Sequence, residues 1–305
     1  MKIKFLIIFL LTFFSMVINA QQPIKRKGAT NIKPKVIQPS SSTITKKKPG
    51  SQQKTRKRRV NNTYYVTDSI AVDESDDNEI IEFQLSDDFT LIGRVKTDYV
   101  DEADAQKEMV EAIAKYDNAK TACLTNHKGV FVYGGNGYYS NQLSSDMMDA
   151  LRYCNNNKYT INDIAVTDIG WWCVVYEGNK YKGSLPDNCK KALDGYIKDG
   201  EKILSLSISE NGNYALITDK HYDASNEFDK KAMKIAGETF DYMKSVCITN
   251  NGIFVTCSKG ALFWDVPENI IEKLKMYQGK PTLIRYTDSG TYIALDGKGL
   301  KLFYM

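Results

Sequence analysis

A turn motif that recurs about every forty residues constrains the fold of this chain more than any other feature. Its five copies are Asn126-His127-Lys128-Gly129, Asp168-Ile169-Gly170, Glu210-Asn211-Gly212, Asn250-Asn251-Gly252 and Asp288-Ser289-Gly290, and their glycines are 41, 42, 40 and 38 residues apart. Two positions after each glycine stands an aromatic residue: Phe131, Trp172, Tyr214, Phe254 and Tyr292. Because aromatic residues make up only 11% of the sequence, this agreement indicates duplication of one structural unit.

The turns separate apolar runs that alternate with a period of two, for example Ile203–Ile208 before the third turn and Trp171–Tyr176 after the second. Such runs around an Asn-Gly or Asp-x-Gly turn are typical of β-hairpins, because Gly and Asn tolerate positive φ angles. In several copies a second glycine-bearing turn follows, such as Gly134–Gly137, and then a short segment such as Leu300–Tyr304. We therefore expect three antiparallel strands in each unit.

A helix is expected to close most units. Three helix starts share an apolar residue, then proline or serine, then a carboxylate: Leu143-Ser144-Ser145-Asp146, Leu185-Pro186-Asp187-Asn188 and Val266-Pro267-Glu268-Asn269. Proline or serine suits the first turn, and the carboxylate favours the positive end of the helix dipole. The leucines eight residues further on should lie on the buried stripe, namely Leu151, Leu193 and Leu274. Related helices are expected over Ala103–Tyr116 and Ser225–Tyr242.

An earlier, degraded copy at Ile80–Ile92 has Asp87-Asp88 at the turn and Phe89 at the aromatic position, which gives six ββ(β)α units over 80–305. One such unit cannot cover its own sheet, so the units must stack or close on one another. We predict a mainly β fold with peripheral helices, arranged as a six-bladed β-propeller, in which Thr63–Val66 supplies a strand that joins the ends of the ring. An open, curved ββα solenoid is the alternative.

The glycine and aromatic repeat over Ile80–Met305 resembles the blades of secreted bacterial β-propeller-like proteins. The motif is general to propeller blades, and the sequence has no WD, kelch or tryptophan-docking signature. What the resemblance implies is therefore an architecture rather than a particular activity.

The N-terminus has the order of a secretory signal peptide: Lys2 and Lys4, the apolar run Phe5–Phe14, and a polar and small-residue stretch that ends at Ala20. Ten apolar residues are fewer than the roughly 20 that a membrane-spanning helix needs, and no second hydrophobic stretch follows. We expect a signal peptide over 1–20 with cleavage near Ala20. The mature protein is then secreted or periplasmic, without a transmembrane segment.

The net charge of +4 conceals two parts of opposite sign. Residues 1–62 hold 15 Lys and Arg and no acidic residue, which leaves 26 basic and 37 acidic residues, a net charge of −11, for the rest. Residues 21–62 are too polar to fold, so we expect a disordered basic linker, followed by a connector over 63–79. The linker can contact an anionic surface, serve only as a tether, or fold back on its acidic domain. The acidic domain would repel phosphate backbones, which argues against nucleic acid.

Linear motifs for catalysis, metal binding or cofactor binding are absent from the sequence. His127 lies in a turn, where we expect it to be solvated. His221, beside Tyr222 and Asp223, is the candidate general base if the protein is an enzyme. The acidic run Asp73–Glu79 lacks the glycine-pivoted spacing of a calcium loop. We therefore predict no metal, no cofactor and no catalytic residues.

Aromatic residues that vary between units are the candidate ligand-binding residues, since they can stack on sugars or contact a peptide: Trp171, Tyr138, Tyr139, Tyr181 and Trp264. The alternative is that they are ordinary half-buried residues of the strands.

The six cysteines raise the question of disulfides in an exported protein. Cys123 and Cys247 occupy matching strand positions, which indicates small buried hydrophobic residues. Cys247 with Cys257, and Cys154 with Cys189, are candidate pairs, but the sequence does not choose among the connectivities.

These observations favour an exported, non-catalytic repeat domain that binds a protein or glycan in the cell envelope or outside the cell. One alternative is a propeller-type hydrolase or lyase that acts on an extracellular polymer, with carboxylates and tyrosines drawn from different blades. The other is a structural component of an envelope assembly.

Overall fold

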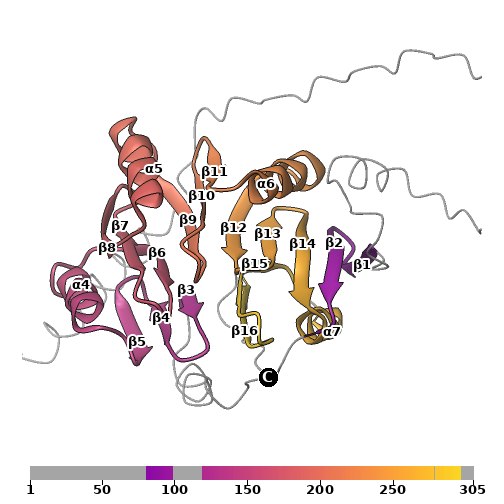
Figure 1. Ribbon diagram of the computed structural model, residues 1–305, viewed down its shortest axis with the longest axis horizontal. Coiled ribbons are helices and arrows are strands. Elements are labelled where there is room, and N and C mark those ends of the chain that lie inside the picture. The colour runs from indigo at the N-terminus through magenta and orange to yellow at the C-terminus, as the bar shows by residue number, and fades with distance from the viewer. Residues whose placement is uncertain (1–79, 99–118, 278, 297–305) are drawn as a thin grey trace, which may run out of the picture. The chain divides into compact units, whose positions relative to one another are not determined.

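The computed structural model describes residues 80–98, 119–277 and 279–296. In these ranges the chain forms sixteen strands and four helices, so the predicted mainly β fold with helices is confirmed (Figure 1). Several predicted segments lie outside the described residues: the signal peptide, the basic linker, Thr63–Val66, Asp73–Glu79, Ala103–Tyr116 and Leu300–Tyr304.

The strands follow one another as small antiparallel sheets, as the repeated turns predict. The first sheet contains β3 (Ala119–Leu124), β4 (Gly129–Tyr133) and β5 (Gly137–Asn141); the second contains β6 (Ile161–Val166), β7 (Trp172–Tyr176) and β8 (Lys180–Ser184). The third contains β9 (Ile203–Ile208), β10 (Tyr214–Thr218) and β11 (Tyr222–Ala224); the fourth contains β12 (Met243–Ile248), β13 (Ile253–Cys257) and β14 (Gly260–Pro267). The fifth contains β15 (Pro281–Tyr286) and β16 (Tyr292–Asp296).

Four helices follow the first four sheets: α4 (Ser145–Asn156), α5 (Asp187–Lys198), α6 (Glu227–Phe240) and α7 (Glu268–Met276). Ser144 caps α4, because its hydroxyl accepts a hydrogen bond from the N–H of Met147 at 3.4 Å. Pro186 and Pro267 lie at the N-cap positions of α5 and α7, one residue before the first turn. The three leucines predicted on the buried stripe are all buried.

The hairpin predicted from the degraded copy is present as β1 (Ile81–Ser86) and β2 (Phe89–Lys96), but it does not form a separate unit. Instead β2 pairs in parallel with β14 and extends the fourth sheet. Gly93 permits this approach, because a Cβ there would lie 1.8 Å from the carbonyl oxygen of Phe263. The prediction of six separate units is therefore wrong for the described residues, which form five sheets.

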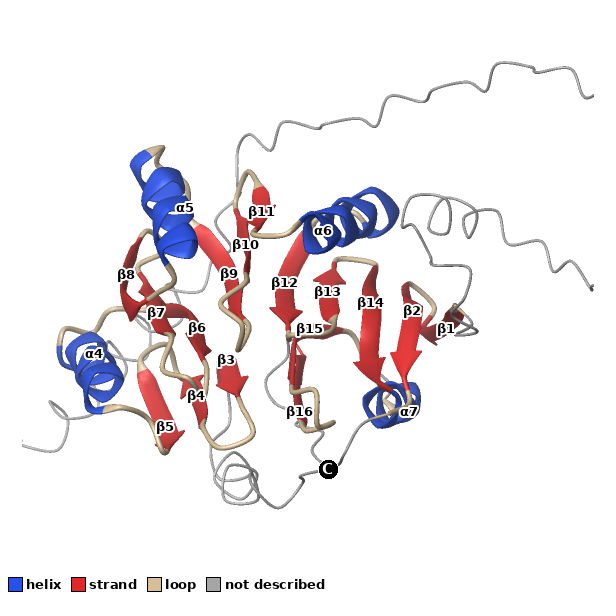
Figure 2. Cartoon of the chain, in the orientation of Figure 1, coloured by secondary structure: helices blue, strands red, loops and turns tan. Residues whose placement is uncertain are grey.

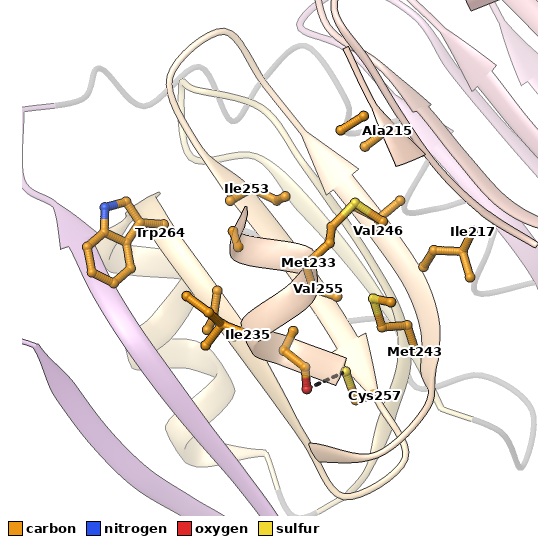
Figure 3. Close-up of a cluster of buried hydrophobic side chains, with 14 of the residues drawn as sticks. Ala215, Ile217, Met233, Ile235, Met243, Val246, Ile253, Val255, Cys257 and Trp264 are labelled. Carbon is orange, nitrogen blue, oxygen red and sulfur yellow. Dashed lines mark hydrogen bonds between the residues drawn. The ribbon is translucent and has the colours of Figure 1, made fainter. Parts of the chain in front are cut away.

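The helices lie beside neighbouring sheets (Figure 2). The core consists of apolar clusters at the contacts between them. α4 buries Leu151 against β4, β6 and β7. α6 buries Met233 in the cluster that contains Trp264, and Figure 3 shows the Cys257 thiol donating to the carbonyl of Ala236 at 3.6 Å. Because each helix contacts the sheets on either side of it, the units depend on one another for burial.

The first strands of the five sheets lie side by side in chain order: β3 contacts β6, β6 contacts β9, β9 contacts β12, and β12 contacts β15. The last sheet also contacts the first, since both β15 and β16 contact β3. The repeat therefore brings its two ends together within the described residues.

Hydrogen bonds link the five repeat turns in the same order. Each bond ends on a side-chain oxygen of the first residue of a turn motif, and two of the donors are the Thr residues that directly precede a motif. The bonds run from Thr125 Oγ1 to Asp168 Oδ1 (2.5 Å), Asp168 N–H to Glu210 Oε1 (2.7 Å), Asn211 N–H to Asn250 Oδ1 (2.8 Å), Thr249 Oγ1 to Asp288 Oδ1 (2.7 Å) and Ser289 Oγ to Asn126 Oδ1 (2.8 Å). The last bond returns to the first turn, so the five turns form an unbroken cycle.

Arg285 on β15 contacts all four other first strands. Its Nε donates to Ala122 O on β3 at 3.2 Å, and its Nη1 donates to Val246 O on β12. Its Nη2 donates to both carboxylate oxygens of Asp163 on β6, at 2.7 and 2.9 Å, and to Leu206 O on β9 at 3.3 Å. The side chains of Arg285 and Asp163 are each only 2% exposed, so this ion pair is buried where the five strands meet.

We predict that replacing Arg285 with methionine lowers the free energy of unfolding by about 3–5 kcal/mol, because it leaves the Asp163 carboxylate buried without its cation. Urea unfolding of the full chain measures this. The control is Lys190→Met, which removes the exposed Lys190–Asp194 pair and should cost less than about 1 kcal/mol. The double variant Arg285→Met, Asp163→Asn should lose less than the sum of its two single variants. A loss below about 1 kcal/mol for Arg285→Met would contradict the structural role of the pair.

The first turn of α6 contains a buried carboxylic acid. Asn226 caps the helix by accepting from the N–H of Asp229 at 2.8 Å, and its side-chain amide donates back to Asp229 Oδ2 at 2.6 Å. Asp229 is only 6% exposed. Burial raises its pKa from 3.8 to about 6, against the lowering effect of the Asn226 bond. The folded chain therefore holds this proton more tightly than the unfolded chain does, and stability falls as the pH rises from about 4 to about 6.

We predict that Asp229→Asn is more stable than the wild type above pH 6, by on the order of 1–3 kcal/mol, and that the difference disappears near pH 4. Thermal or urea unfolding across this pH range measures the difference. Glu227→Gln, an exposed residue of the same helical turn, should give no such gain. A pH-independent difference for Asp229→Asn would contradict the assignment.

Candidate functional site

A shallow groove of about 670 Å³ lies between α4 and the outer strand β8. Figure 2 shows α4 beside β7 and β8, in agreement with their contacts. The lining from α4 is Asp146, Asp149, Ala150 and Tyr153, and the lining from the sheet is Trp172, Tyr181, Lys182 and Gly183. Steps of three or four residues along α4 place its contribution on one face of the helix.

Tyr153 presents an aromatic ring to this groove and is 38% exposed. Its ring lies in a cluster with Tyr159 and Tyr176, at centroid distances of 5.7 and 6.1 Å. Tyr159 and Tyr176 stack on each other at 5.5 Å. These contacts hold the Tyr153 ring in a fixed orientation before any ligand arrives.

Charges of both signs border the groove. Lys182 Nζ lies 4.2 Å from the centroid of the Tyr153 ring, a cation–π contact. Asp146 and Asp149 are exposed on α4. Asp149 forms an ion pair with Arg152 at 2.9 Å, in which both partners are well exposed, so the pair is weak and leaves the carboxylate accessible.

Tyr181 is held in place from the opposite side. Its hydroxyl donates to Asp194 Oδ1 at 2.6 Å, and Asp194 also pairs with Lys190 at 2.5 Å. Burial and the bond to Asp194 raise the pKa of Tyr181 to about 12, so this phenol stays neutral at physiological pH. The groove therefore combines fixed aromatic surfaces with accessible carboxylates.

The structure does not bring the five predicted ligand-binding aromatics together. Tyr181 lines the groove, and Tyr138 packs at the edge of the α4 cluster. Tyr139 stacks on a different core residue, the Phe131 ring, at 5.7 Å, and Trp171 packs against the α5 cluster. Trp264 is 1% exposed and lies in the core (Figure 3), so it belongs to no surface.

Trp172 is the aromatic residue two positions after the glycine of the second turn. The equivalent residues of the other four turns are buried, whereas Trp172 is half-buried and lines the groove. The sequence did not indicate a binding role for the other groove residues of α4, namely Tyr153, Asp146 and Asp149. Their spacing along one helix face is visible in the sequence, but nothing local indicates that this face borders an open strand.

A second candidate lies at the β10–β11 hairpin. His221 Nδ1 is 2.7 Å from Glu201 Oε1, and the Thr218 hydroxyl donates to Glu201 Oε2 at 2.5 Å. The Glu201 side chain is 5% exposed and the His221 side chain 62% exposed. A buried carboxylate thus orients an exposed imidazole, which is the arrangement of a general base. Tyr196 lies beside it at a ring-centroid distance of 6.2 Å.

The pair of His221 and Glu201 shares no residue with the lining of the groove. His127 is exposed in its turn. In the described ranges, no cluster of three or more His, Cys, Asp or Glu side chains is arranged to hold a metal ion. No helix in the same ranges is long and apolar enough to cross a membrane.

All six cysteines are buried with free thiols. Neither candidate disulfide is formed. Cys123 and Cys247 pack toward the next unit, with Sγ 3.9 Å from the carbonyl oxygens of Val166 and Tyr286 respectively. Burial raises the pKa of Cys123 to about 12, so this thiol is a buried hydrophobic group and not a nucleophile.

A comparison with models of known protein families found no match to the chain, and a search of curated proteins found none either. The groove and the pair of His221 and Glu201 are therefore the features from which a function can be inferred.

Proposed function

We propose that this chain is an exported, non-catalytic binding domain that takes a macromolecular ligand, a protein or a glycan, in the groove between α4 and β8. The observation that carries the proposal is the groove lining, in which Tyr153, Trp172 and Tyr181 meet two accessible carboxylates. Half-buried aromatic rings with a polar border are the usual composition of such binding surfaces.

The scaffold in this proposal is a closed β-propeller of five units. Three observations support closure over an open solenoid: the contact of β15 and β16 with β3, the cycle of turn hydrogen bonds, and the bonds from Arg285 to all other first strands. An open solenoid would leave its first and last turns unpaired.

Export is proposed from the order of charged, apolar and small residues up to Ala20. The basic segment 21–62 would then link the domain to an anionic surface of the cell envelope or serve as a plain tether. A structural role within an envelope assembly is compatible with the same groove, which would then bind a neighbouring component.

We predict that Asp149→Lys together with Tyr153→Ala weakens ligand binding by at least about tenfold, because the pair removes an accessible carboxylate and an aromatic surface. The full chain is assayed on a glycan array and on a library of displayed peptides. Glu272→Lys, an exposed acid-to-lysine change on α7, is the matched control and should bind like the wild type. Ligands that bind the groove variant and the wild type equally well would remove the groove from the proposal.

The pair of His221 and Glu201 supports a second candidate function, that of a hydrolase or lyase that acts on an extracellular polymer. His221 would be its general base, oriented by Glu201.

The binding proposal predicts that the full chain cleaves no polymer in a panel of polysaccharides and peptides. Because His221 lies outside the groove, we expect His221→Asn to bind the groove ligand as the wild type does. Release of reducing ends or of new amino termini measures cleavage. Cleavage that is lost in both His221→Asn and Glu201→Gln would replace the binding proposal with the enzymatic one.

A further inference from the structure

In the fourth sheet, a strand from outside the unit pairs with the outer strand. β14 is the last strand of its own unit, and β2, from more than 160 residues earlier in the chain, pairs with it in parallel from Gly260 opposite Thr90 to Pro267 opposite Lys96. Arg94 of β2 fixes this pairing, because its guanidinium forms a bidentate ion pair with Asp265 and lies 5.1 Å from the Trp264 ring.

β2 lies along the outer edge of β14, and α6, the helix before the fourth sheet, packs directly against β14. Ile92 of β2 is buried in the cluster that α6 forms with the fourth sheet. Chain order makes α4 and the sheet β6–β7–β8 the counterparts of α6 and the sheet β12–β13–β14. The outer edge of β8, beside the groove, is thus the counterpart of the edge of β14 that β2 covers.

The edge of β8 is open among the described residues. β8 pairs only with β7, and four of its five residues are exposed. Gly183 lies in the groove lining without a side chain to cover the backbone, and it cannot be replaced freely, because a Cβ would lie 2.5 Å from the carbonyl oxygen of Trp172. Unpaired main-chain groups on such an edge form hydrogen bonds with an extended segment.

Lysines on edge strands usually discourage strand addition. Here Lys180 and Lys182 lie over the rings of Tyr159 and Tyr153, at 5.3 and 4.2 Å from the centroids. These contacts direct both ammonium groups toward the aromatic cluster. The groove lining contains the exposed carboxylates of Asp146 and Asp149 on α4, of which Asp149 also pairs with the exposed Arg152. Because Lys182 of β8 lies over the Tyr153 ring, the carboxylates are the charged groups that the groove offers to a ligand, which favours a ligand with positive charge.

We propose that the groove binds an extended segment of a partner polypeptide, which pairs with the edge of β8 as β2 pairs with β14 and directs basic side chains toward Asp146 and Asp149. The basic side chains then lie on the α4 side of the sheet, near Trp172, and apolar residues in the alternate positions contact Tyr181 on the opposite side. This inference rests on the proposed function and names its ligand class.

The test begins with a displayed library of random nine-residue peptides selected on the full chain. We expect enriched peptides in which basic and apolar residues alternate, and at least about tenfold weaker binding to Asp146→Lys, Asp149→Lys than to the Glu272→Lys control. The best peptide is then synthesised with a single N-methyl group at each backbone position in turn. Strand addition predicts that every second N-methyl group weakens binding by about tenfold or more, because only alternate N–H groups point toward β8.

A uniform or irregular response to N-methylation would overturn strand addition, as would peptides that bind the lysine double variant as well as the wild type. Groove-dependent binding of an arrayed glycan, with no peptide enriched, would also overturn it while leaving the proposed function in place. If neither peptides nor glycans bind in a groove-dependent manner, both proposals fail.

Discussion

The buried ion pair of Arg285 and Asp163 is the interaction on which the arrangement of the units depends. Taking these two charges out of water costs several kcal/mol each, and this cost is recovered only when all their hydrogen-bonding groups are satisfied. Arg285 on β15 and its partners on the four other first strands together span five strands, so the pair is satisfied only when all five units are in place. The Asp163 carboxylate also accepts from the Thr121 hydroxyl at 2.6 Å and from the Leu206 N–H at 2.7 Å. Wrong alignments of the units leave a buried charge unpaired.

Much of the fold was predictable because its local chemistry repeats. The turn glycines located the first two strands of each unit, and Ser144, Pro186 and Pro267 located the helix starts. The number of units was not predictable in the same way. The hairpin at Phe89 has the same local pattern as the others, and only its pairing with β14, decided by distant residues such as Phe263, makes it an added strand instead of a unit.

The candidate site was less predictable than the fold, for a related reason. Whether an aromatic residue is buried depends on what covers it, and the covering element comes from another unit. Trp172 and Phe254 occupy the same position of the repeat, yet Phe254 is buried and Trp172 reaches the groove. Likewise, nothing near His221 in the sequence indicates Glu201, twenty residues earlier, as the partner of its imidazole.

The cycle of turn hydrogen bonds has a consequence for how such a chain can evolve. Each turn motif is preceded by Ser or Thr and begins with a residue that carries a side-chain oxygen, as in Thr125-Asn126 and Ser209-Glu210. In a linear array, a tandem duplication adds one more repeat at little cost, because each repeat contacts only its neighbours. Here a sixth copy would have to open the cycle and draw the strands away from Arg285. We therefore expect duplication of a whole unit to be disfavoured in this protein, and new specificity to arise through changes in the elements between existing units.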